Sequence, residues 1–282
     1  MKPIQTTHTT ADGYSLFVQS WLPAEEAQVV VCLVHGLGEH SGRYQHVAEF
    51  LNNHCAAMLA FDLRGHGRSS GKRGHVDAFE SFMEDIHWLI SEAQIEFPDL
   101  PCFIYGHSLG GLLTLNYVLR RSPNLRGVIV TSPGLRTALE EQNAKLWLAR
   151  MGERLLPEFS LPTGLDPALL SHDQQVIENY LNDPLVHDRA SFRMACATLD
   201  AIPYAYAEAH NFHLPLLLMH GGKDGIAFPR GSEEFAAAVL SGPEANKDCT
   251  LKIWENLYHE THNEPQKDEV LAYLWDWIQD RL

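Results

Sequence analysis

Short runs of apolar and β-branched residues alternate with segments of helical periodicity along most of this chain. The run VVVCLV at 29–34 lacks the alternation of a half-exposed strand, so it is typical of a strand buried on both faces. Strands are predicted at 14–22, 27–36, 56–65, 102–108, 125–134, 214–224 and 249–259, with helical patterns between most of them. Strands that alternate with helices imply an α/β fold, with a mostly parallel sheet covered by helices on both faces.

One long interval, residues 135–212, departs from this alternation. It contains only helical and proline-containing segments, so we expect a helical cap (lid) inserted into a core formed by 1–134 and 213–282. Long insertions in α/β folds usually lie over the carboxyl ends of the strands. Most of the apolar side chains of this interval should pack inward, and some could line an acyl tunnel or face lipid.

The acidic balance of the chain limits its partners. Its 282 residues, 45% of them hydrophobic, suit a soluble core in one large domain or two small ones. There are 36 acidic against 21 basic residues, a formal net charge of −15. Binding to nucleic acid needs a basic face, so we expect no nucleic-acid partner. The charge also disfavours adsorption to anionic membranes, which leaves transient hydrophobic contact through the cap as the most that we expect.

The cysteines and the apolar runs bear on the compartment. Five cysteines are spread along the chain without CxxC spacing, at Cys32, Cys55, Cys102, Cys196 and Cys249. This pattern is typical of reduced intracellular thiols and not of a disulfide framework or a zinc site. No apolar run reaches the roughly 18 residues of a membrane-spanning helix, and the start MKPIQTTHTTADGYSL lacks the apolar core of a secretory signal. We therefore expect a cytoplasmic protein, at most peripheral to a membrane.

The segment GHSLG at 106–110 follows a predicted strand and opens a predicted helix. It matches G-x-S-x-G, the nucleophile elbow, in which glycines allow close backbone approach and the serine hydroxyl is exposed on a strained turn. The dipole of the following helix favours developing negative charge beside that hydroxyl. The strand–turn–helix context makes Ser108 the candidate nucleophile.

A serine hydroxyl needs a base that is oriented by a carboxylate. In this fold the acid and then the histidine follow the serine along the chain. Asp224 lies at the carboxyl end of the predicted segment 214–224, after the strand residues 214–220, and His259 at the carboxyl end of 249–259, after the strand residues 249–254. Both therefore lie on the sheet edge that carries Ser108, and we predict the triad Ser108, Asp224 and His259.

Other residues compete for these roles, because the chain has 16 histidines. The rival bases are His262, His220 and His107. The rival acids Asp248 and Asp200 lie outside strand-end turns, and we expect Asp62 to brace the turn around Arg64 and His66.

Acyl transfer also needs donors for the oxyanion. One is expected from the backbone N–H of Leu109, directly after the nucleophile, and the other from Leu37 in the loop after the strand 27–34. Gly36 and Gly38 allow that loop to approach a substrate without Cβ clashes.

Several segments together resemble a known family. HGLGEHSGRY, FDLRGHGRSSGKRGHV, GHSLGG, NDPLV, HGGKD and YHETHNE occur in order across nearly the whole chain. They are similar to the monoacylglycerol lipase and lysophospholipase group of the α/β-hydrolase fold. GHSLGG is generic to that superfamily, whereas HG-x-GEHSGRY joined to YHE-x-HNE is much more specific to the group.

The resemblance implies an eight-stranded sheet, a helical cap after the sixth strand, and hydrolysis of a small lipid ester without cofactor or metal. It assigns the triad and oxyanion roles to the residues already named, and contact with the glycerol head group to Glu39, Arg43 and His262. An ion pair within the loop is the alternative for Glu39 and Arg43, and both interpretations can hold together.

We therefore expect a serine carboxylic ester hydrolase that cleaves monoacylglycerols through an acyl-enzyme. The alternatives are a lysophospholipase, a short- or medium-chain carboxylesterase, or a peptidase of the same fold. From a different class, a ligand-binding protein that retains the triad but turns over poorly remains open.

Overall fold

The computed structural model describes residues 2–137, 143–242 and 248–282, and within them one sheet of eight strands. Its spatial order is β1-β2-β4-β3-β5-β6-β9-β10. The strands are β1 (Ile4–Thr9), β2 (Ser15–Trp21), β3 (Val29–Val34), β4 (Ala56–Phe61), β5 (Cys102–His107), β6 (Gly127–Thr131), β9 (Leu216–Gly221) and β10 (Cys249–Trp254). Within this order, the strands β4, β3, β5, β6, β9 and β10 pair in parallel. Strands β1 and β2 form an antiparallel hairpin at one edge, and β2 pairs antiparallel with β4. The predicted α/β architecture is confirmed.

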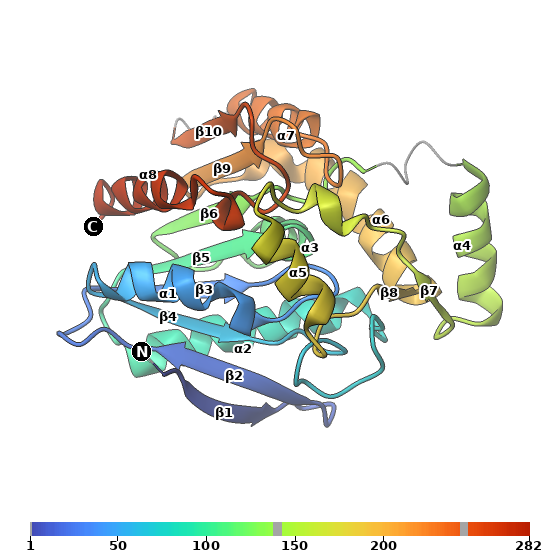
Figure 1. Ribbon diagram of the computed structural model, residues 1–282, viewed down its shortest axis with the longest axis horizontal. Coiled ribbons are helices and arrows are strands. Elements are labelled where there is room, and N and C mark those ends of the chain that lie inside the picture. The colour runs from blue at the N-terminus through green and yellow to red at the C-terminus, as the bar shows by residue number, and fades with distance from the viewer. Residues whose placement is uncertain (1, 138–142, 243–247) are drawn as a thin grey trace.

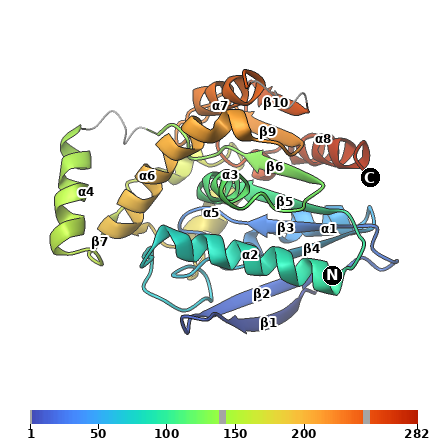
Figure 2. The ribbon, with the colours of Figure 1, turned by 180° about the vertical axis from the view of Figure 1, so that it is seen from behind.

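Helices cover both faces of this sheet (Figures 1 and 2). Helices α1 (Gln45–Asn52) and α8 (Lys267–Gln279) pack on one face, and α2 (Phe79–Glu96), α3 (Leu109–Arg121) and α7 (Arg230–Leu240) on the other. The side chains of β3 explain why its sequence shows no polar alternation. Val30, Cys32 and Val34 enter one core, whereas Val29 and its alternate neighbours enter the opposite core.

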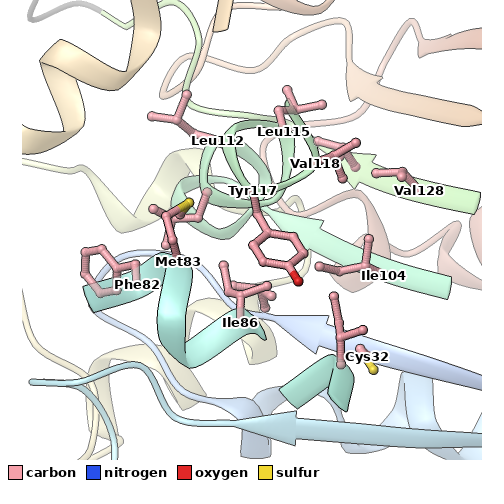
Figure 3. Close-up of a cluster of buried hydrophobic side chains, with 14 of the residues drawn as sticks. Cys32, Phe82, Met83, Ile86, Ile104, Leu112, Leu115, Tyr117, Val118 and Val128 are labelled. Carbon is pink, nitrogen blue, oxygen red and sulfur yellow. The ribbon is translucent and has the colours of Figure 1, made fainter. Parts of the chain in front are cut away.

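The core under α2 and α3 contains the apolar face of α2 (Figure 3). Phe82, Met83 and Ile86 are at most 1% exposed and pack with side chains of α3 and the sheet. Burying each such side chain contributes about 1.5–3 kcal/mol. Tyr117 also lies in this core, and its hydroxyl is hydrogen-bonded to the His87 ring. This packing fixes the strand and helix on either side of residue 108.

The segment between β6 and β9 contains several short elements. They are α4 (Asn143–Leu155), β7 (Ser160–Pro162), α5 (Gln174–Asn182), β8 (Arg189–Ser191) and α6 (Phe192–Glu208), with 3-10 turns η2 (Pro167–Leu169) and η3 (Ala209–Asn211). The expectation that no strand occurs here is wrong, because β7 and β8 pair antiparallel. Three residues are too few to produce a periodic pattern. Helix α4 packs on α6 and stands away from the sheet (Figure 1).

Two observations bear on the other expectations. All five cysteines lie in the described residues and are free. The described helices include no segment with the length and apolar character needed to cross a bilayer.

The remaining 3-10 turns, η1 (Ser41–Tyr44) and η4 (Thr261–Asn263), belong to the loops described next.

Candidate active site

Ser108 lies on a strained turn between β5 and α3. Its backbone has φ 54° and ψ −117°, which residues other than glycine rarely adopt. A Cβ on Gly110 would overlap the carbonyl oxygens of Val34 and His35, and a Cβ on Gly106 would overlap the backbone of Gly110. The two glycines therefore allow α3 to begin directly against β3, and this close packing holds the serine in its turn.

Replacing Gly110 with alanine is expected to destabilise the fold by about 3 kcal/mol, because backbone carbonyls cannot move aside as a flexible side chain could. Urea unfolding followed by circular dichroism measures this loss. The control is Gly13→Ala, since a Cβ there meets no atom within 4 Å, although its φ of +89° adds local strain. A Gly110→Ala protein as stable as the parent would contradict the close-packing argument.

The structure brings the three predicted triad residues into one hydrogen-bonded chain. His259 Nε2 lies 2.9 Å from Ser108 Oγ, and His259 Nδ1 lies 2.7 Å from Asp224 Oδ2. The residues follow β5, β9 and β10, so all three come from the carboxyl ends of parallel strands. His259 is 2% exposed and Asp224 is 5% exposed. The arrangement is that of a nucleophile, a base and an orienting carboxylate.

Burial and the neighbouring groups have opposite effects on the pKa values of Asp224 and His259. Burial alone would raise the pKa of Asp224, but His259 and His220 outweigh it, and the pKa lies well below its usual range. Asp224 Oδ1 also accepts hydrogen bonds from the N–H groups of Ile226 and Ala227. Burial alone would lower the pKa of His259, but the Asp224 carboxylate outweighs it and raises the pKa above its usual value. Asp224 therefore favours the imidazolium form of its neighbour.

The rival histidines lie close to the triad, but among the described residues none of them is hydrogen-bonded to the Ser108 hydroxyl. His220 Nε2 lies 3.1 Å from Asp224 Oδ2, the oxygen that His259 also contacts. His107 is buried and hydrogen-bonded to the hydroxyl of Thr131. Both histidines therefore pack beside the triad and do not take the place of His259.

The rival acids have other partners. Asp248 pairs with Arg281 and Asp200 with Arg150. Asp62 braces the turn that contains Arg64 and His66, as expected, because its Oδ2 accepts a hydrogen bond from the backbone N–H of Arg68, while its Oδ1 accepts from the N–H and hydroxyl of Ser41. The Arg64 guanidinium reaches two other carboxylates, Asp85 and Asp12.

The two predicted oxyanion donors lie beside the serine. Leu109 is the first residue of α3, so its N–H has no acceptor within the helix. Among the described residues, neither its N–H nor that of Leu37 has a hydrogen-bond partner. A Cβ on Gly36 would lie 3.2 Å from the Cβ of Ser108, so the loop that carries Leu37 passes directly along the serine.

Glu39, Arg43 and Glu260 form an ion-paired group, called here the Arg43 cluster. Arg43 Nη1 lies 2.7 Å from Glu39 Oε2 and 2.6 Å from Glu260 Oε1, and Nη2 lies 2.7 Å from Glu260 Oε2. Glu39 Oε1 also accepts hydrogen bonds from the Gly36 N–H and the Tyr44 hydroxyl. The ion pair expected as an alternative is thus present. Sequence reasoning missed Glu260, whose only signal was its place directly after the base histidine.

His262, the third residue assigned to the head group, is not brought to the cavity described below. It is fully buried, and its ring stacks on Tyr44 with centroids 4.7 Å apart and meets His107 edge-on. Burial lowers the pKa of His262 to about 3, so the ring is neutral. It therefore packs behind the Arg43 cluster.

A cavity of about 620 Å³ opens beside Ser108. Three groups described above contribute to its wall. They are Ser108 and His259 of the triad, the leucines of the two oxyanion loops, Leu37 and Leu109, and the Arg43 cluster of Glu39, Arg43 and Glu260. Much of the remaining wall is apolar and comes from the segment between β6 and β9, including Leu161, Leu169, Phe192, Met194, Leu199 and Ile202. Among the residues that the structure describes, no group of three His, Cys, Asp or Glu side chains is arranged to hold a metal ion.

Part of the segment between β6 and β9 is hydrogen-bonded to the two loops of the site. The Glu260 N–H donates to the Leu170 carbonyl at 2.8 Å, beside the base histidine. The His187 N–H donates to the Gly38 carbonyl at 2.8 Å, in the loop that carries Leu37. Residues 167–191 are thus fixed to the loops, whereas α4 packs on α6.

Comparisons with known proteins identify the family of the chain. Residues 25–266 match the family described as serine aminopeptidase S33. The chain is 40% identical over 274 residues to an uncharacterized abhydrolase domain-containing protein of Dictyostelium discoideum, of whose length it spans 28%. It is 32% identical to a monoacylglycerol lipase of Mycolicibacterium smegmatis, over 96% of this chain and 95% of that protein.

Among solved structures, the monoacylglycerol lipase of Paleococcus ferrophilus matches with a TM-score of 0.85 and 35% identity, over 95% of this chain and 99% of that one. The chain is a hydrolase of the serine aminopeptidase S33 family and belongs to the monoacylglycerol lipase and lysophospholipase group of the α/β-hydrolase fold.

Proposed function

We propose that this lipase or esterase cleaves monoacylglycerols to a fatty acid and glycerol through an acyl-enzyme on Ser108. The observation that carries the proposal is the hydrogen-bonded chain of Ser108, His259 and Asp224 at the wall of a largely apolar cavity. An apolar cavity with a few polar groups suits a ligand that has one acyl chain and a small polar head. The names of the relatives from M. smegmatis and P. ferrophilus support the same substrate.

In the proposed reaction, His259 takes the proton of Ser108 Oγ while that oxygen attacks the ester carbonyl carbon. The N–H groups of Leu37 and Leu109 donate to the oxyanion of the tetrahedral intermediate. When the intermediate collapses, the bond to the glycerol oxygen breaks and His259 returns its proton to that oxygen. Water then attacks the acyl-enzyme with His259 as base, which releases the fatty acid and restores Ser108.

Glu39 and Arg43 are the proposed contacts of the glycerol hydroxyls, because both line the cavity and carry hydrogen-bonding atoms. Their ion pair does not oppose this role, since a carboxylate oxygen has more than one lone pair to offer. His262 is left out of the contact role, because it is fully buried. Its proposed part is to support Tyr44, on which it stacks.

Residues 135–212 are proposed to act as the cap. Five large apolar side chains on α4 and the turn after it are exposed, namely Trp147, Leu148, Leu155, Leu156 and Phe159. Exposed apolar patches of this kind are typical of contact with lipid or protein. The net charge of −15 disfavours lasting residence on an anionic bilayer, so the proposed contact is brief.

A substrate panel tests the proposal. Purified protein should cleave a monoacylglycerol at least about tenfold faster, as kcat/KM, than the diacylglycerol, triacylglycerol and lysophosphatidylcholine of the same acyl chain. Chromatography of the released fatty acid measures each rate. An aminoacyl anilide tests the peptidase alternative, and a faster rate on it or on lysophosphatidylcholine would replace the proposed substrate. A fluorophosphonate-labelled protein that turns over no ester would instead support a ligand-binding role.

A further inference from the structure

The cavity wall carries more negative than positive charge. The charged side chains that line it within the described residues are Glu39, Arg43, Asp166 and Glu260, three carboxylates and one guanidinium. Of the two histidines on the wall, His107 is kept neutral because burial lowers its pKa well below the usual value, and a proton on His259 is balanced by the Asp224 carboxylate 2.7 Å away. A ligand that enters this cavity therefore meets an excess of acceptors for hydrogen bonds and little positive charge.

The single guanidinium of the wall, that of Arg43, is already hydrogen-bonded to two carboxylates. Three hydrogen bonds of Arg43, each 2.7 Å or shorter, go to the carboxylates of Glu39 and Glu260, and the two oxygens of Glu260 hold it in bidentate fashion. Its guanidinium also lies over the ring of Tyr180, 4.9 Å from the centroid. A phosphate that approached Arg43 would have to compete with two buried carboxylates for the same N–H groups.

Arg43 and Glu260 keep their charges at neutral pH. Burial alone would raise the pKa of Glu260, but Arg43 lowers it to about 2. Burial alone would lower the pKa of Arg43, but Glu260 and Glu39 raise it well above its usual value. With all three groups ionised, the cluster carries one net negative charge in a site that is largely shielded from water, where charges act more strongly than in solution.

Resting on the proposed function, we propose that Glu260 determines the specificity of the site for an uncharged polyol head group over one that carries a phosphate. Glu39 and Arg43 alone would form a neutral pair, so Glu260 supplies the excess charge. A glycerol hydroxyl can donate to the carboxylate oxygens of the cluster, because a hydroxyl has a proton to give. A phosphate oxygen that has lost its proton cannot donate, and the carboxylates repel it.

Glu260→Gln tests the proposal, because glutamine has nearly the same shape and no charge. Short acyl chains keep the substrates monomeric, so we compare hexanoylglycerol with hexanoylglycerol phosphate, and use p-nitrophenyl hexanoate as an ester without a polyol head. The readout is the ratio of kcat/KM for the phosphate ester to kcat/KM for the neutral ester. The proposal predicts a low ratio in the parent and an increase of about tenfold in Glu260→Gln.

Two further variants make the test independent of how well Glu260→Gln folds. Asp166→Asn removes an exposed carboxylate of the cavity wall, and asparagine still caps the turn that begins there. It should raise the ratio by a smaller factor, because Asp166 is exposed and better screened. Glu26→Gln is the matched control. Glu26 is exposed and lies before β3, at the amino ends of the parallel strands and so opposite the site, and this variant should leave the ratio unchanged.

The outcomes separate this inference from the proposed function. A parent protein that cleaves the phosphate ester as fast as the neutral ester overturns the role of Glu260, while the proposed function stands. If Glu260→Gln lowers the rates on all three esters by one factor, Glu260 only holds the loops, and the inference is again overturned. A parent protein that cleaves none of the three esters refutes the proposed function itself.

Discussion

Ser108→Ala is expected to lower kcat for ester hydrolysis by about 10⁵-fold or more, because no other hydroxyl can form the acyl-enzyme in its place. The hydroxyl that is removed lies 2.9 Å from the base nitrogen of His259. The release of p-nitrophenol from p-nitrophenyl hexanoate measures the loss, and a fluorophosphonate probe should no longer label the protein. A residual rate above about a hundredth of the parent rate would contradict the assignment of the nucleophile.

Thermal unfolding separates a chemical loss from a structural one. Alanine keeps the Cβ at residue 108, so the strained backbone remains and Tm should stay within a few degrees of the parent value. Ser108→Gly removes the Cβ that makes φ 54° costly, and it should raise the free energy of unfolding by about 1 kcal/mol while abolishing activity. A glycine variant that is inactive but more stable would show that the backbone strain at residue 108 lowers stability and is kept because the serine there is needed for activity.

Asp224→Asn is expected to lower kcat by about 10⁴-fold at neutral pH. The asparagine amide can present an N–H to His259 Nδ1, which favours the wrong tautomer and leaves Nε2 protonated toward Ser108. The imidazolium that forms during acylation also loses its carboxylate partner. The control is Asp248→Asn, which removes a rival acid paired with Arg281 and should leave kcat unchanged. Equal losses in both variants would contradict the triad.

The pH profile of the same variant gives a second readout. The parent is active when His259 is neutral, and its raised pKa places the acid limb of kcat/KM above the usual histidine value of about 6.5. Removing the Asp224 charge lowers that pKa, so the acid limb should move to lower pH in Asp224→Asn. Rates measured across a buffer series check the direction, and a limb that stays in place would contradict the coupling.

The sequence predicted the parts of the fold that local patterns encode. Strands buried on both faces, such as β3, and the elbow at Ser108 follow from short stretches, and chain order then identifies Asp224 and His259 as partners. The strand β1 was not predicted, because it is an exposed polar edge strand whose pairing with β2 fixes it. Polar side chains on an edge strand give no apolar signal.

The Arg43 cluster could not be predicted, because its members are far apart in the chain. Arg43 and Glu260 are separated by 217 positions, and only the folded sheet brings their loops together. The resemblance placed His262 at the head group, yet its burial depends on how Tyr44 and His107 pack around it. Contacts of this kind depend on tertiary packing and leave no periodic trace in the sequence.

The division within the segment between β6 and β9 has a consequence for substitutions in this segment. Residues 167–191 share hydrogen bonds with the loops of Glu260 and Gly38, so a change there alters the reacting groups as well. Helix α4 contributes Leu148 and Ala149 to the cavity wall while packing on α6, away from the sheet. Substitutions in α4 would therefore reshape the cavity wall at Leu148 and Ala149 without altering the hydrogen bonds that join Leu170 and His187 to the loops of the site.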